Sequence, residues 1–252
     1  MRNTDVDWEK LAQDNAYWAV LTEDGFKGEP SPQMLASFFA RGEENVRNFQ
    51  AEIQRRFPAF APPFDTVVDF GCGAGRLLLP MARQATSAFG IDISETMRAL
   101  TTQNAASFGL RNVMCVPTAE ELVARGVKAD WVSSFIVLQH IEPRRGYFII
   151  NDLLQLVKPG GFVSLHVPLF KSADQRQYYN DRMMYFRNDY YRTETVFIDR
   201  DNYQSPDIQM YDYDANTIIA LFHKNQMTKV ELVHDGAGTG IHSYLFIGCR
   251  GV

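Results

Sequence analysis

Short apolar runs alternate with longer amphipathic runs between residues 64 and 167, with few residues separating them. The apolar runs 65–70, 87–92, 112–117, 129–141 and 162–170 predict strands, the fourth continuing into a loop. The runs between them predict helices over 74–85, over 94–109 with Ser94 as N-cap, over 119–126, and from Pro143 to a turn at 158–161. This rhythm is typical of repeated βαβ units, so we expect an α/β fold.

The segments on either side of this alternation have other patterns. Helices are predicted over 5–21 and 44–57, so we interpret residues 1–60 as a helical cap on the same domain as residues 61–252. After the fifth strand the rhythm breaks, which predicts a lid insertion over 171–213. A helix over 214–227 and two antiparallel strands over 229–235 and 243–250 end the pattern.

Composition excludes several classes of protein. The net charge of −5 and the pI near 5.6 argue against binding to duplex nucleic acid, which needs clustered basic residues. No apolar run reaches the roughly 20 residues of a membrane span, and the first 15 residues lack the pattern of a secretory signal. We therefore expect a cytoplasmic protein with neither a nucleic-acid nor a membrane partner.

The sequence offers no pattern typical of a disulfide framework or a metal site. Its cysteines, Cys72, Cys115 and Cys249, are far apart and odd in number, which predicts that all three are reduced and structural. No CxxC or HxxxH spacing and no cluster of carboxylates is present. We expect no metal.

The run "VVDFGCGAGRLLLPMA" (67–82) places an aspartate and three close glycines between a strand and a helix. Such a turn brings backbone N–H groups at a helix N-terminus up to a ligand. Gly71, Gly73 and Gly75 are spaced GxGxG, one residue tighter than the dinucleotide pattern GxGxxG. Asp69 would repel a pyrophosphate here, which favours a ligand with an ammonium or sulfonium group. Asp92 closes the second strand, where an acid accepts hydrogen bonds from two ribose hydroxyls.

At these residues the sequence resembles class I S-adenosylmethionine-dependent methyltransferases. "VVDFGCGAGR" and "GIDIS" look like the first two motifs of that family, and "FIVLQHI" and "LVKPGGFVSL" match its later strand ends. The resemblance implies a Rossmann-like, seven-stranded, mostly parallel sheet with an antiparallel last strand, S-adenosyl-L-methionine as cofactor, and methyltransferase activity. The lid and "IQMYDYD" (208–214) are similar to methyltransferases of bacterial glycan and natural-product pathways.

The resemblance also implies which residues contact the cofactor. Arg41 is expected either to reach the cofactor carboxylate from the cap or to be an exposed arginine beside a helix start. The other implied contacts are to the methionine part (Asp69, Gly71, Cys72, Gly73, Gly75), the ribose (Asp92), the adenine (Ile93, Thr118, Ala119, Glu120) and the cofactor face of the fourth strand (Phe135, Val137).

Two histidines are candidates for the base that methyl transfer to a hydroxyl requires. His140 follows the fourth strand and is interpreted either as this base or as a hydrogen-bonding loop residue. His166, near the end of the fifth strand, is the second candidate. We expect the acceptor to be a hydroxyl of a sugar or other polar metabolite, with a phenol or an amine as alternatives.

Residues 171–213 hold eight of the eleven tyrosines, and Trp8, Tyr17 and Trp18 would face them from the cap. Aromatic rings among polar groups suit a lid over a ring-bearing substrate and equally suit an oligomer contact, so a homodimer stays open. A different class also remains: a catalytically silent, cofactor-binding partner subunit. Formation of S-adenosylhomocysteine would separate it from the enzyme.

Overall fold

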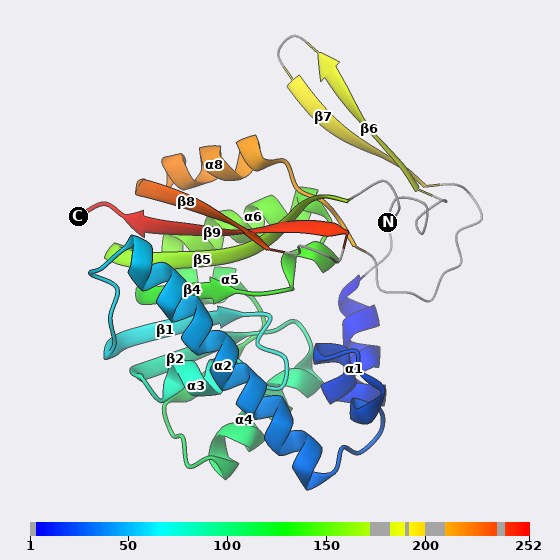
Figure 1. Cartoon of the computed structure of the whole chain (residues 1–252), viewed down its shortest axis with the longest axis vertical. Helices are drawn as coiled ribbons and strands as arrows, with labels where there is room; N and C mark the ends of the chain where they lie inside the picture. Colours follow the sequence, from blue (N-terminus) through cyan, green and yellow to red (C-terminus); the bar gives the residue numbers. More distant parts are fainter. Residues whose placement is uncertain (1–3, 172–181, 190–191, 200–209, 236–239) are drawn as a thin grey trace.

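The computed structural model describes residues 4–171, 182–189, 192–199, 210–235 and 240–252, with the backbone alone for 182–189 and 192–199. Seven strands form one sheet in the order β3-β2-β1-β4-β5-β9-β8 (Figure 1). The strands are β1 (Phe64–Phe70), β2 (Ala85–Ile91), β3 (Val113–Val116), β4 (Ala129–Ser134), β5 (Val157–Lys171), β8 (Met227–Asp235) and β9 (Ile241–Arg250).

Strands β1 to β5 are parallel, and β9 runs antiparallel to both of its neighbours, β5 and β8. The structure therefore confirms the predicted α/β fold, its mostly parallel sheet and its reversed last strand. Because the strands are parallel, their carboxyl ends meet at one edge of the sheet, where open α/β sheets bind ligands.

Helices cover both faces of the sheet, which explains why the strands read as continuous apolar runs. The residues of α5 (Ala119–Ala124), α6 (Pro143–Leu156) and α8 (Ala215–Lys224) contribute to the core on one face. Those of α2 (Pro32–Arg56) and α3 (Leu78–Ala82) contribute to the core on the other, where α2 crosses the front of the sheet in Figure 1. The helix α4 (Glu95–Ser107) packs against β3 and against α1 (Thr4–Val20).

Helix α2 begins at Pro32, whereas the sequence predicted a start at residue 44. Ser31 caps the helix by accepting a hydrogen bond from the Met34 N–H, and Pro32 occupies the first helical position. Position 42, inside the helix, requires glycine because a Cβ there would lie 2.1 Å from the carbonyl oxygen of Arg76. Arg41 is exposed, as the second interpretation predicted, but its placement beside a helix start is wrong, since it lies within α2.

The prediction of a helix over 74–85 was too long. Only Leu78–Ala82 is α-helical, because the glycine turn occupies the first part of this range and Ala85 already belongs to β2. Pro80 lies in the first turn of this short helix, where a missing N–H is tolerated.

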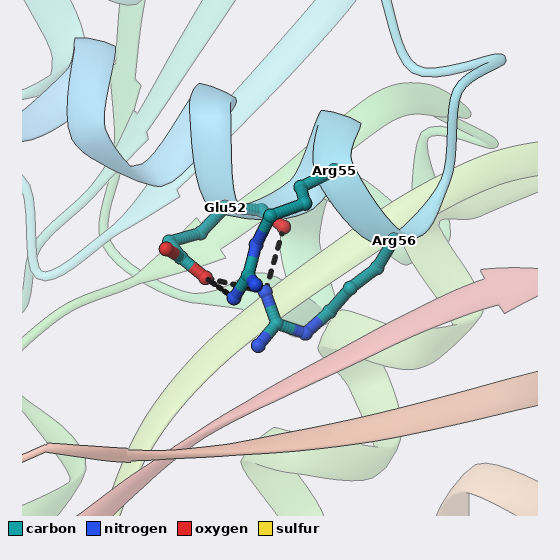
Figure 2. Close-up of polar contacts among 3 residues, drawn as sticks. All are labelled: Glu52, Arg55 and Arg56. Atoms are coloured by element: carbon teal, nitrogen blue, oxygen red, sulfur yellow. Dashed lines mark hydrogen bonds and ion pairs between the residues drawn. The ribbon is translucent and has the colours of Figure 1, made fainter.

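The carboxyl end of α2 is fixed to the far edge of the sheet. Glu52 accepts hydrogen bonds from Arg55 at 3.0 Å and from Arg56, and Figure 2 shows both guanidinium groups turned back toward it. The Lys229 ammonium of β8 donates to the Arg56 carbonyl at 3.0 Å and lies 4.6 Å from the centre of the Phe57 ring. The two Lys229 contacts tie the carboxyl end of α2 to β8, whereas the Glu52 pairs stabilise the last turns of the helix itself.

Strands β6 (Arg182–Asp189) and β7 (Arg192–Asp199) pair as an antiparallel hairpin within the predicted insertion. The side chains of 172–209 lie outside the described residues, so the choice between acceptor lid and oligomer contact stays a prediction, as does the division at residue 60. Two tyrosines at the end of the insertion, Tyr211 and Tyr213, are buried in the core. The Tyr213 hydroxyl lies 3.0 Å from the Leu138 carbonyl oxygen and 2.8 Å from that of Ile141.

Candidate functional site

The turn after β1 depends on its glycines. Gly71, Gly73 and Gly75 have φ angles of 73°, 52° and 88°, in the left-handed region that side chains disfavour. Space is also restricted: a Cβ on Gly71 would lie 2.2 Å from Val137 Cγ2, and one on Gly73 would lie 2.7 Å from Val20 Cγ2. The turn is therefore enclosed between α1 and the loop after β4.

Asp92, at the end of β2, holds this turn through its carboxylate. Its Oδ2 accepts the Gly73 N–H at 2.9 Å, and its Oδ1 accepts the Ser94 N–H at 2.9 Å. Burial raises the pKa of Asp92 above its ordinary value, and the two backbone donors oppose this rise. Each carboxylate oxygen has a second lone pair, so two further donors can be accepted.

Asp69 is buried beneath the turn, with 2% of its surface exposed. Burial raises the pKa of Asp69 to about 8, while the positive charge of Arg76 lowers it and the charge of Asp92 raises it further. Arg76 is itself buried, and its Nε has no hydrogen-bond partner among the described residues. The carboxyl group of Asp69 and the guanidinium group of Arg76 are thus both buried at the edge of the sheet where ligands bind.

Helix α1 lies beside the start of α4 at the carboxyl edge of the sheet (Figure 1). The Glu9 carboxylate accepts the Ser94 hydroxyl at 2.7 Å and the Thr96 hydroxyl at 2.6 Å. These hydrogen bonds, the one from Thr96 first, lower the pKa of Glu9 to about 2. The predicted N-cap is confirmed, because the Ser94 Oγ accepts the Met97 N–H. Tyr17 continues the contact by donating to Asn104 at 3.3 Å.

The chain leaves β4 through a strained residue. Ile136 has a φ of 59°, an unusual conformation for a β-branched side chain, and is 45% exposed. Phe135 before it packs between Phe49 and His166, with ring centres 4.6 and 4.8 Å away. Val137 after it contacts Gly71. Strain of this kind is found most often at ligand sites.

The two candidate bases have different surroundings. His140, in the short helix η2 (Leu138–His140), has its Nε2 3.0 Å from the Gln139 amide nitrogen, and its ring centre lies 5.1 Å from that of Trp8 in α1. His166 is buried on β5, with its Nε2 3.4 Å from an Asp235 carboxylate oxygen and its Nδ1 without a partner among the described residues. Helix α1 therefore reaches His140 as well as the turn.

The remaining predicted residues lie around this centre. Thr118 caps α5 by accepting the Glu121 N–H, Ala119 is buried and Glu120 is exposed, all at the end of β3. The carbonyl oxygen of Ile93 accepts a hydrogen bond from Arg98 at 2.9 Å. Arg41 donates to Glu23 at 2.6 Å. Their predicted contacts with a cofactor stay predictions.

Through its contacts the structure brings together Asp69, Asp92, Val137 and the glycine turn with Cys72, and it adds three residues that sequence reasoning missed. Arg76 directly follows the glycines, so its position was a usable signal. Glu9 gave none, because an acid on an amphipathic helix is normally solvated. The left-handed Ile136 gave none either, since the residue type disfavours that conformation.

Comparison with known proteins now gives this arrangement a family. Residues 67–161 match the family described as a methyltransferase domain. These residues belong to that family. A ubiquinone biosynthesis O-methyltransferase of Sinorhizobium medicae is 32% identical over 120 residues, which cover 47% of this chain and 48% of the relative. One of Chelativorans sp. is 33% identical over 110 residues, 43% of each. The chain thus matches less than half the length of these relatives.

Solved structures extend the likeness over the whole chain. Magnesium protoporphyrin IX methyltransferase from Synechocystis PCC 6803, with bound SAH, has a TM-score of 0.64 at 17% identity and covers 98% of both chains. The N-methyltransferase NodS from Bradyrhizobium japonicum, also with SAH, has a TM-score of 0.60 at 13% identity over 99% of both. At such identities the likeness shows that the chain shares the fold of these two methyltransferases.

Two further observations on this methyltransferase fold concern membranes and metals. Across the part of the chain that the structure describes, every helix is too short or too polar to traverse a bilayer. Within the same residues, no three side chains of His, Cys, Asp or Glu gather closely enough to bind a metal ion.

Replacing Asp69 with asparagine should change how stability depends on pH. An unfolded Asp has a pKa near 3.9 and the folded one about 8, so between these values folding takes up a proton. The contribution of Asp69 to stability therefore falls as pH rises through this window. The asparagine side chain cannot ionise, so the Asp69→Asn variant should gain more than about 1 kcal/mol relative to the wild type between pH 5 and pH 8.

Urea unfolding at pH 5, 6.5 and 8 measures this difference. Asp14→Asn, at an exposed position of α1, is the control and should show no such gain. A stability difference for Asp69→Asn that stays constant over the range would contradict the buried, protonated carboxyl.

Proposed function

We propose that this protein transfers the methyl group of S-adenosyl-L-methionine to a hydroxyl of a small polar metabolite. The observation that carries the proposal is the turn whose Gly73 N–H is held by Asp92, at the ligand-binding edge of a class I methyltransferase sheet. The matched methyltransferase domain and the names of the curated relatives support it.

The residues at this edge fit the proposed cofactor. The free acceptor positions of Asp92 suit the two ribose hydroxyls, and the left-handed glycines let the backbone turn sharply beside this carboxylate. Asp69 stands where the methionine part would lie, and a cation there would favour its ionised form. A pyrophosphate would instead meet two acids, Asp69 and Asp92. The set therefore favours a cationic nucleoside.

In the proposed reaction the cofactor supplies an electrophilic methyl group, and the protein supplies alignment, shielding and a proton acceptor. The glycine turn and Asp92 position the donor. Helix α1 covers this edge of the sheet and would exclude water from it. Its Glu9 accepts the Ser94 hydroxyl at the start of α4, and its Val20 packs against Gly73. His140, oriented by Gln139 and Trp8, takes the proton from the acceptor hydroxyl.

The acceptor is proposed as an oxygen because the curated relatives are named O-methyltransferases. A sugar and a phenol both suit the flat Trp8 ring beside His140. N-methylation is the second candidate, since the solved neighbour NodS is an N-methyltransferase and matches over 99% of both chains. Residues 171–213 would complete this side, either as a lid or through a homodimer contact.

Product formation tests the proposal directly. Purified protein incubated with S-adenosylmethionine and panels of sugars, phenols and amines should produce S-adenosylhomocysteine with hydroxyl acceptors. Tight binding of S-adenosylmethionine without turnover in any panel would instead favour a silent partner subunit.

The cofactor role of Asp92 is tested by Asp92→Ala. Loss of two hydrogen bonds to the ribose should weaken S-adenosylmethionine binding by about 1–3 kcal/mol in calorimetry. Asp65→Asn, at the opposite end of β1, should leave the affinity unchanged. Thermal unfolding must show that Asp92→Ala is folded, because the change also frees the Gly73 N–H. Wild-type affinity in the folded variant would refute the ribose contact.

The role of His140 is tested by turnover on the true acceptor. His140→Ala should lower kcat by roughly 10²–10⁴-fold and leave cofactor affinity intact, because the base acts on the acceptor. His223→Ala, on the exposed side of α8, is the matched control. Near-normal turnover would remove His140 as the base, and a large loss in a folded His166→Gln variant would transfer the role to His166.

A further inference from the structure

Two thiols meet beside the glycine turn. Cys72 directly follows Gly71, and its N–H donates to the Ile91 carbonyl at 3.1 Å, so this residue has crossed from β1 to lie over β2. Cys115, on the neighbouring strand β3, pairs in register with Gly90 of β2. The Cys72 and Cys115 thiols are hydrogen-bonded to each other across this glycine.

Gly90 provides the space for this contact. A Cβ at that position would lie 2.7 Å from Cys72 Sγ and 3.2 Å from Cys115 Sγ, so both sulfur atoms approach the same point above β2. The φ angle of Gly90 is not positive, so its backbone conformation does not require glycine. The close approach of the side chains, including Leu78 at 2.7 Å, explains why no larger residue fits.

The two thiols differ in reactivity. Cys115 is partly exposed on the edge strand β3, and its hydrogen bond with Cys72 lowers its pKa. Cys72 is buried, and the same hydrogen bond together with burial raises its pKa well above the ordinary value. Because the thiolate is the reactive form, Cys115 is the thiol that an oxidant meets first.

We propose that Cys72 and Cys115 form an oxidisable pair whose disulfide closes the cofactor site. With hydrogen peroxide as oxidant, the Cys115 thiolate attacks one oxygen, an S–O bond forms, the O–O bond breaks, and the departing hydroxide takes up a proton to become water. Cys72 then loses its proton and attacks the Cys115 sulfur, the S–S bond forms and the S–O bond breaks. The second oxygen leaves as water, and the two thiols have supplied two electrons.

The disulfide would act through the glycine turn. An S–S bond of about 2.05 Å is shorter than a contact between two thiols, so the sulfur atoms must move together. This movement draws Cys72 toward β3. Gly71 and Gly73 flank Cys72, and Gly73 is bonded to Asp92, so this movement disturbs the carboxylate that would hold the ribose. This consequence rests on the proposed function, whereas formation of the disulfide does not.

The test uses the full chain carrying Cys249→Ser, so that these two cysteines are the only thiols. After hydrogen peroxide treatment, peptide mass spectrometry without reductant should find Cys72 linked to Cys115. Calorimetry should show that S-adenosylmethionine affinity falls at least tenfold and returns with dithiothreitol. The matched Cys115→Ser variant should keep its affinity under the same treatment.

Each outcome decides a separate point. Absence of the linked peptide after peroxide treatment overturns the oxidisable pair. A linked peptide with unchanged affinity overturns closure of the site. If the reduced protein does not bind S-adenosylmethionine, the proposed function fails, while the linked peptide still decides whether the pair is oxidisable.

Discussion

The hydrogen bond between the Gly73 N–H and the Asp92 carboxylate is the contact on which the site depends. It joins the turn after β1 to the end of β2. The other oxygen of Asp92 accepts the Ser94 N–H at the start of α4, and the Ser94 hydroxyl donates to Glu9 of α1. The Asp92 carboxylate thus joins the two strand ends and the start of α4 directly, and the Ser94 hydroxyl extends this hydrogen-bond network to α1.

Charge explains why this arrangement suits a cationic ligand. Burial raises the pKa values of both Asp69 and Asp92, and each is raised further by a neighbouring acid. Arg76 offsets part of this cost, but burial lowers its own pKa. A positive group beside Asp69 would relieve the conflict among the acids, whereas a phosphate would increase it. These charges therefore favour a cationic ligand over a phosphate at this edge of the sheet.

Local patterns were sufficient where local physics decides the outcome. The five central strands and the Ser94 cap were predicted from neighbouring residues, and the mostly parallel sheet was implied by the family resemblance; the structure confirms all three. The start of α2 was missed because Gly42 resembles a helix break. Glycine is required there for another reason: the carbonyl oxygen of Arg76, far away in the sequence, leaves no room for a Cβ. Glu9 was missed because its partner is 85 residues away. The contact between Cys72 and Cys115 is likewise created by strand register, which spacing alone does not reveal.

Direct binding of the wild-type protein is the measurement closest to the central claim that the turn and Asp92 hold a cationic nucleoside. Calorimetric titrations with S-adenosylmethionine and with NAD at equal concentrations separate the two ligand classes. We predict saturable binding of S-adenosylmethionine at one site per chain and no heat of binding for NAD. Binding of NAD without S-adenosylmethionine binding would contradict the account.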